Sequence, residues 1–239
     1  MSLKENLSIA KDQIRSAERK AAHGQKVKLV AGTKTRDFKT INTAYECGVK
    51  SIGENRVQED ELKFESFEKM PGLEKRFIGH LQSNKAKKCL ALFDTIDSIH
   101  SLKVAKKINN HLAQEERKIK TLLEVNMSGD QQKHGFSPEN IEDMIHTISL
   151  KALNVEGLMT IGPVSRDEKE TKSAFRGLRE LKERLNSEIK NAPLTELSMG
   201  MSGDFKIAIQ EGSTMVRLGT VLFGKRNEGE VKIKDGSKV

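Results

Sequence analysis

The feature that most constrains the fold is a regular alternation along the chain. Eight short β-like runs are each followed by a charged, amphipathic stretch typical of a helix. The runs cover residues 28–34, 51–55, 76–80, 94–99, 120–126, 155–162, 196–201 and 214–223. Strands that alternate with helices predict a parallel sheet, and eight such units in 239 residues predict closure into a barrel. We therefore expect an α/β fold, a single (β/α)8 TIM barrel.

An open, doubly wound sheet also fits this alternation. Such a sheet usually has a glycine-rich phosphate turn after its first strand, and the chain has neither a GxGxxG nor a GxxxxGK[ST] motif. The barrel is therefore favoured. An extra helix is expected over about residues 2–22, where it would plug or flank the barrel. Residues with N-cap preferences stand before the expected helices: Asp37, Ser83, Ser101, Ser137 and Asp204.

One domain is expected over residues 1–226, with no C-terminal β-domain. Residues 227–239 are polar and lack periodicity, so we expect a disordered tail. No apolar run approaches the roughly 18 residues of a membrane span, and the first residues lack the apolar stretch of a signal peptide. The sequence thus predicts a cytoplasmic protein without membrane contact.

The net charge of +8 does not indicate a nucleic-acid partner. The 42 Lys and Arg are interleaved with 34 Asp and Glu, as on solvated helix faces, and one Tyr with no Trp gives no platform for stacking bases. Cys47 and Cys89 lie far apart and outside any CxxC or Cys/His cluster, so we expect buried, reduced thiols and no metal site.

The chemistry of a TIM barrel is found at the C-terminal ends of its strands, and phosphate commonly binds after strands seven and eight. Lys34 ends the first run, where alternation places Val30, Gly32 and Lys34 on the inner face. A lysine there is a usable amine nucleophile for a carbonyl, although the pattern alone favours an ordinary surface lysine at a strand end.

A phosphate site is suggested by two glycine-containing turns. The GMSGD turn, residues 200–204, combines two glycines and a hydroxyl with the start of a helix, whose free N–H groups attract anions. Gly219 and Thr220, at the end of the eighth run, add a second close backbone approach and a second hydroxyl. Two ordinary turns would show the same residues, so only their joint position after strands seven and eight favours phosphate.

Six stretches together carry a family resemblance. They are LVAGTKT (29–35), GENRVQE (53–59), FIGHLQSNK (77–85), GLMTIG (157–162), LSMGMSGD (197–204) and GSTMVRLGTVLFGKR (212–226). In this order they resemble the pyridoxal phosphate homeostasis protein family, also called the YggS or PROSC family, whose barrel is related to the N-terminal domain of alanine racemase (fold type III). The similarity covers about residues 28–226.

The resemblance implies that the chain binds pyridoxal 5′-phosphate (PLP) as a Schiff base on Lys34, and that Arg217 meets the pyridine nitrogen. It also implies a set of contacts to the rest of the cofactor: Ser202, Gly219, Thr220 and Met201 at the phosphate, with Ser198 and Gly200 as further candidates, and Asn55, His80 and Met159 along the ring. From the residues alone, Asn55 and His80 could equally satisfy loop backbone, and Met159 could be core. The chain departs from the family pattern at Gly32, where a β-branched residue is usual, and at Arg36-Asp37, where Lys-Pro is common.

Two functions remain open at this point. The resemblance implies a PLP carrier or regulator in vitamin B6 homeostasis that contacts PLP-dependent apoenzymes transiently. We expect a monomer, because the sequence lacks the added domain that completes dimeric racemase sites. The alternative is a racemase-like enzyme, or an aldolase that uses Lys34 without PLP. Racemisation needs a second acid–base group, and the only tyrosine, Tyr45, lies on a helix stripe expected to face the sheet. An arginine cannot protonate the ring nitrogen, which weakens the ring as an electron sink. We therefore expect no enzyme activity.

Overall fold

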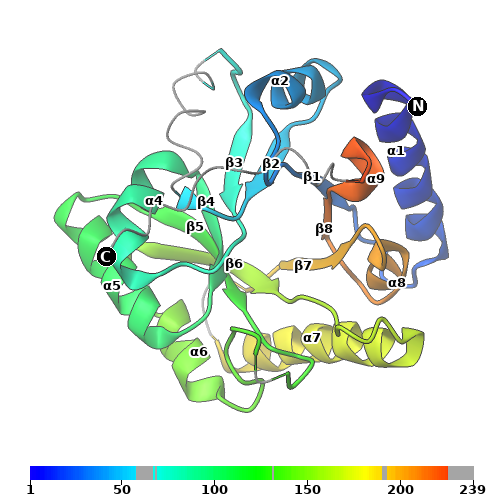
Figure 1. The fold of residues 1–239 in the computed structure, drawn as a ribbon. Helices are drawn as coiled ribbons and strands as arrows, with labels where there is room; N and C mark the ends of the chain where they lie inside the picture. The colour runs from blue at the N-terminus through cyan, green and yellow to red at the C-terminus, as the bar shows by residue number, and fades with distance from the viewer. Residues whose placement is uncertain (58–66, 68, 131, 190–192, 226–239) are drawn as a thin grey trace, which may run out of the picture.

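The computed structural model describes residues 1–57, 67, 69–130, 132–189 and 193–225. Within this part of the chain, eight parallel strands form one closed barrel in sequence order, which confirms the expected fold (Figure 1). The strands are β1 (Lys28–Gly32), β2 (Ser51–Glu54), β3 (Glu74–Phe77), β4 (Thr95–Ile99), β5 (Ile119–Glu124), β6 (Leu153–Met159), β7 (Glu196–Met201) and β8 (Met215–Leu218).

Helices surround the barrel, as the amphipathic stretches predict (Figure 1). They are α1 (Leu3–Lys20), α2 (Phe38–Glu46), the 3-10 turn η1 (Ser83–Lys85), α4 (Ala86–Leu92), α5 (Leu102–Gln114), α6 (Ile141–Ile148), α7 (Glu168–Glu188), α8 (Phe205–Gln210) and α9 (Thr220–Phe223). No β-domain follows the barrel in the described residues, and residues 227–239 lie outside them.

The extra helix α1 flanks the barrel and does not plug it. Ser2 and Glu5 form a capping box at its start, and its apolar side buries Leu7, Ala10 and Ile14. These residues join an apolar cluster with residues of α2, α8 and α9. Figure 1 shows α1 on the outside, next to α8 and α9.

The eighth predicted strand is wrong in its second half. β8 ends at Leu218, and residues 220–223 form the short helix α9. The sequence Thr-Val-Leu-Phe looks like a strand because of its β-branched and aromatic residues, but tertiary packing decides here. Asn6 of α1 donates a hydrogen bond from Nδ2 to the carbonyl of Leu222 (2.9 Å), and this contact helps to hold α9 on the outside.

Three of the predicted N-caps occupy cap positions. Asp37 and Ser101 accept hydrogen bonds from backbone N–H groups of α2 and α5. Asp204 stands before α8, but its carboxylate accepts from the Met201 N–H instead of capping the helix. Ser83 and Ser137 were predicted wrongly. Ser83 lies inside η1, which has no side-chain cap, and α6 begins at residue 141 with a neighbouring asparagine as its cap.

The barrel interior contains buried charges. Arg76 on β3 donates to both carboxylate oxygens of Asp97 on β4, at 2.8 and 3.0 Å, and also pairs with Glu74 at 2.7 Å. The side chains of Arg76 and Asp97 are 4% and 0% exposed. Burial disfavours the guanidinium charge, but the attraction of the two carboxylates outweighs it and holds the pKa of Arg76 above its usual value.

Cys47 and Cys89 are reduced thiols; Cys89 is buried as expected, whereas Cys47 is only half-buried. No helix in the described residues is long and apolar enough to cross a membrane.

Tyr45 is half-buried, and its hydroxyl donates to the Pro71 carbonyl (3.0 Å), just before β3 begins. The hydroxyl therefore lies near the N-terminal ends of the strands, away from the barrel mouth formed by their C-terminal ends.

Candidate functional site

Lys34 lies in a turn at the barrel mouth, because β1 ends two residues earlier. The Thr33 hydroxyl donates to Glu54 Oε1 (2.7 Å), and the Arg36 N–H donates to the Thr33 carbonyl (2.9 Å). Thr35 has φ +66°, a left-handed conformation that few non-glycine residues adopt. The Lys34 side chain is half-buried, and its ammonium has no hydrogen bond or ion pair within the described residues. The turn therefore presents an amine that is free to react.

The loops after β7 and β8 meet at Ser202. Its hydroxyl oxygen accepts hydrogen bonds from the backbone N–H groups of Gly219 and Val221, both at 3.2 Å. These two N–H groups belong to the start of α9, where helical N–H groups lack partners within the helix. The two turns that were singled out in the sequence are thus brought together. They place one hydroxyl beside two backbone N–H groups, which here donate to that hydroxyl, and both kinds of group can bind a phosphate.

Glycines allow the backbones to come close at this point. A Cβ on Gly32 would lie 3.7 Å from the Gly219 Cα, so the end of β1 packs directly beside the turn at Gly219. Gly200 has φ +97°, and a Cβ there would lie 2.6 Å from the Ala208 Cβ. Only glycine fits that position. Met201, by contrast, is 40% exposed, and Thr220 is exposed at the first position of α9.

Arg217 projects from β8 into the barrel and is 6% exposed. Its Nη1 donates to the carbonyl and the hydroxyl of Ser198, both at 2.8 Å, and its Nη2 donates to the Thr160 carbonyl at 2.8 Å. Burial lowers the pKa of Arg217 from its usual value, while Asp97 and other carboxylates oppose that shift. Ser198 therefore supports the arginine, which keeps two of its five N–H donors for another group.

The remaining predicted ring contacts lie on the same face. A Cβ on Gly79 would be 2.2 Å from the Asn55 carbonyl oxygen, so the loop that carries His80 packs tightly against Asn55. Met159 is buried at the end of β6, where its Cα pairs in register with Ser198. All the predicted site residues thus lie at or near the C-terminal ends of the strands.

Several polar residues of the mouth were missed in the sequence. Glu124 ends β5 and is 7% exposed, and burial raises its pKa to about 7 although Arg217 opposes the shift. Lys133, in the next loop, donates to the Ser128 hydroxyl (3.0 Å) and the Gly162 carbonyl (2.8 Å). A charged residue within the otherwise apolar run Leu-Leu-Glu-Val was the available signal for Glu124.

The rings of His80, His100 and His134 lie together at the mouth. The ring centroids of His80 and His134 are 3.6 Å apart, and those of His80 and His100 are 4.4 Å apart. No group of three or more His, Cys, Asp or Glu among the described residues is arranged to hold a metal ion. The two outer rings of this cluster were not predicted.

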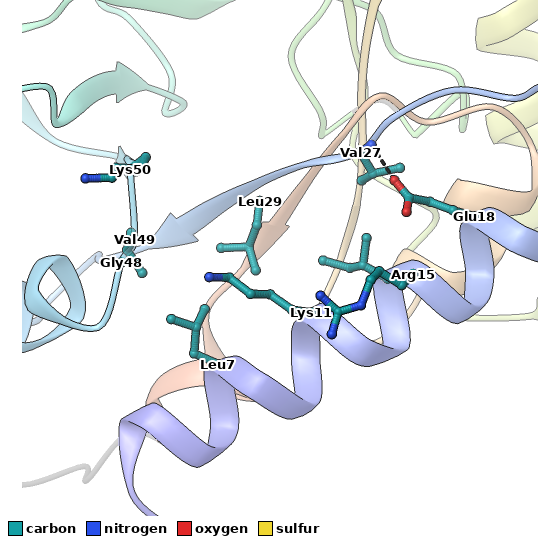
Figure 2. Close-up of a pocket in the computed structure, with 10 residues that line it drawn as sticks. Leu7, Lys11, Arg15, Glu18, Val27, Leu29, Gly48, Val49 and Lys50 are labelled. Atoms are coloured by element: carbon teal, nitrogen blue, oxygen red, sulfur yellow. Dashed lines mark hydrogen bonds between the residues drawn. The ribbon is translucent and has the colours of Figure 1, made fainter.

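A separate cavity of about 300 Å³ lies between α1 and the N-terminal ends of β1 and β2. Figure 2 shows Leu7 and Leu29 there, with the cationic side chains of Lys11 and Arg15 along the helix. Glu18 accepts a hydrogen bond from the Val27 N–H (2.7 Å) at its far end. This cavity lies at the end of the barrel opposite the mouth and shares no residue with the predicted site.

Comparison with known proteins identifies the family of this chain. The family model for the alanine racemase N-terminal domain matches residues 5–227. The chain is 40% identical over 224 residues to the pyridoxal phosphate homeostasis protein of Aquifex aeolicus, covering 93% of this chain and 97% of that protein. It is 36% identical over 230 residues to the Haemophilus influenzae protein of the same name, covering 95% and 97%.

Solved structures of related proteins are also similar to this chain. PipY of Synechococcus elongatus with PLP bound is similar with a TM-score of 0.83 and 32% identity, over 93% of this chain and 100% of that chain. Alanine racemase of Clostridium difficile shares the fold, with a TM-score of 0.74 and 17% identity over 97% of this chain and 62% of that chain. The chain therefore belongs to the pyridoxal phosphate homeostasis protein family.

Proposed function

We propose that this protein binds PLP at the barrel mouth and acts in PLP homeostasis, with Lys34 as the residue that holds the cofactor covalently. PLP supplies an aldehyde that condenses with a lysine amine. The observation that carries the proposal is the close approach of β1 and β8: Gly32, two residues before Lys34, packs on Gly219 of the phosphate turn. One small ligand with an aldehyde and a phosphate fits these two groups.

Each residue has a physical role in this proposal. The Ser202 hydroxyl and the N–H groups of Gly219 and Val221 would hold the phosphate, with Thr220 and the backbone of Met201 beside them. The free donors of Arg217 would face the pyridine nitrogen, and Asn55, His80 and Met159 would line the ring. Gly200 and Ser198 would act through the backbone turn and through Arg217 respectively.

A binding role without turnover is the better-supported form of the function. A racemase-type reaction needs a second acid–base group within reach of the substrate, and the single tyrosine donates its hydroxyl to Pro71 away from the mouth. His80 is the residue at the mouth that could otherwise serve. We further propose a monomeric protein that meets PLP-dependent apoenzymes only transiently. We also propose a cytoplasmic location, which agrees with the two reduced thiols, Cys47 and Cys89.

Lys34→Ala tests the covalent role directly. We expect the variant to fold normally, because the side chain lies in a surface turn outside the packed core, and to lose the visible absorbance of covalently bound PLP. Borohydride reduction followed by peptide mass spectrometry should place the cofactor on Lys34 in the wild-type protein. Lys39→Ala, at an exposed position of α2, is the matched control and should keep the adduct. Reduction that fixes PLP mainly on another lysine in Lys34→Ala would remove Lys34 from this role.

A further inference from the structure

Three imidazoles gather on the side of the mouth formed by the loops after β3, β4 and β5. His80 and His134 are stacked, with an interplanar angle of 21°, and the ring centroids of His100 and His134 are 5.8 Å apart. His80 and His134 are exposed, and His100 is half-buried. The proposed phosphate turn belongs to β7 and β8, so the cluster occupies a different part of the rim.

No carboxylate forms an ion pair with this cluster in the described residues. Within the described residues, the hydrogen-bond partner of the three rings is the Ser98 carbonyl, 3.3 Å from His100 Nδ1. The neighbouring cation is Lys133, whose ammonium donates to Ser128 and Gly162. Burial lowers the pKa of Lys133, and the carboxylate of Asp130 in the same loop opposes that shift. Glu124 and Arg217 lie deeper, inside the barrel. The rings therefore have donors to offer and no anion of their own.

Without a nearby anion, protonation of these imidazoles is unfavourable. Burial, followed by repulsion from His100 and His134, lowers the pKa of His80. Burial also lowers the pKa of His100, and His134 adds to that shift while the Ser98 carbonyl opposes it. A bound anion would supply the missing counter-charge and favour proton uptake by the imidazoles.

We propose that His80, His100 and His134 form a carboxylate subsite for an amino acid at the barrel mouth. The proposal rests on the proposed function, since an amino acid is the amine that a PLP aldehyde can receive and its carboxylate needs a place outside the phosphate turn. Stacked rings do not converge on one point as metal ligands do, but their N–H edges can donate to the two oxygens of a carboxylate.

Acetate binding to the purified protein, followed through the histidine side-chain nitrogens by NMR, tests the subsite. We expect acetate to shift the resonances of the three rings toward the protonated form. At pH values above the lowered pKa values of His80 and His100, the affinity for acetate should rise by about tenfold for each unit that the pH falls, if one proton accompanies each anion. Sodium chloride at equal ionic strength should not reproduce the shift, and inorganic phosphate should mainly perturb the Ser202 turn.

Variants separate this subsite from the PLP site. His134→Asn should lower acetate affinity by about tenfold, a loss expected for one charge-assisted partner. His146→Asn, an exposed histidine of α6, is the matched control and should leave the affinity unchanged. Lys34→Ala should keep the acetate response, so failure of the PLP assignment and failure of the subsite are distinguishable. Equal shifts with chloride, no pH linkage, or unchanged affinity in His134→Asn would overturn the proposal.

Discussion

At the scale of single residues, position in the barrel decides which side chain can react. Alternation along the first run correctly places Val30 and Gly32 inside, but Lys34 reaches the mouth through a turn and not as a strand residue. That turn depends on the Thr33–Glu54 hydrogen bond, which joins residues 21 positions apart. A local sequence pattern carries no information about a contact between residues so far apart. The sequence therefore predicts Lys34 but not the hydrogen bond that holds its turn.

Glu124 should make stability depend on pH. Its pKa is raised from 4.5 to about 7 by burial, so the folded protein holds this proton more tightly than the unfolded chain. The stabilisation is fully present below pH 4.5 and is lost as the pH rises through about 7. The effect is at most about 3 kcal/mol, at about 1.4 kcal/mol for each pH unit.

Urea unfolding of Glu124→Gln between pH 5 and 8 measures this effect. The amide stays neutral and keeps the shape of the side chain, so the variant should gain stability relative to wild type at pH 8 and little at pH 5. Glu142→Gln, at an exposed position of α6, should follow the wild-type pH dependence. Parallel curves for Glu124→Gln and wild type would mean that the carboxyl does not titrate in this range.

The phosphate assignment predicts a selective loss of affinity. Ser202→Ala combined with Thr220→Val removes two hydroxyls that we assign to phosphate, so PLP binding should weaken by about 10- to 100-fold while unphosphorylated pyridoxal is little affected. Spectroscopic titration with each ligand measures the two affinities. Equal losses for PLP and pyridoxal would place the phosphate elsewhere.

At the scale of elements, period and alternation predict which segments are strands and helices, but not what the barrel encloses. A TIM barrel interior is usually filled by branched apolar residues. Here β3 and β4 place Arg76 against Asp97. The outer faces of the same strands carry apolar residues, so their sequences resemble those of ordinary barrel strands and do not reveal the buried pair. The strand prediction for residues 220–223 failed for a related reason, because the contact that holds α9 is made by α1 at the other end of the chain.

Breaking the pair between β3 and β4 should be costly. Asp97→Leu leaves the buried guanidinium with only the partly exposed Glu74 as its partner and should lower the free energy of unfolding by about 3–5 kcal/mol. Arg76→Met combined with Asp97→Leu should recover much of that loss, because neither the buried guanidinium nor the Asp97 carboxylate remains. Lys120→Gln removes an exposed pair with Glu156 and should cost less than about 1 kcal/mol. Denaturant unfolding compares the three variants, and a loss for Asp97→Leu no larger than that control would contradict the role of the pair.

At the scale of the whole molecule, the fold could be predicted from eight strand–helix units along the chain. The family could be predicted because six of its motifs occur in the family's order. The arrangement of the mouth could only be predicted in part. Its proposed phosphate side comes from turns with recognisable residue types, Gly200 to Asp204 and Gly219 with Thr220. Its histidine side comes from three separate loops, and single histidines at strand ends carry no signal of their own. Closure of the barrel brings them together, which is a property of the entire chain.

The arrangement of the whole mouth also predicts that the protein does not turn over amino acids at enzymatic rates. Arg217, which we propose faces the ring nitrogen, is a donor that cannot give up a proton. The Tyr45 hydroxyl donates to Pro71 at the other end of the barrel. The lack of one positioned acid–base group typically costs a factor of about 10² to 10⁴ in rate, and a weak electron sink adds to it. Incubation with L-alanine and other amino acids in deuterated water, followed by NMR and chiral chromatography, measures α-proton exchange and formation of the D-isomer. His80→Gln serves as the comparison, because His80 is the acid–base candidate at the mouth. Turnover of about 1 s⁻¹ or faster that disappears in His80→Gln would make the protein a racemase-like enzyme with His80 as its acid–base group.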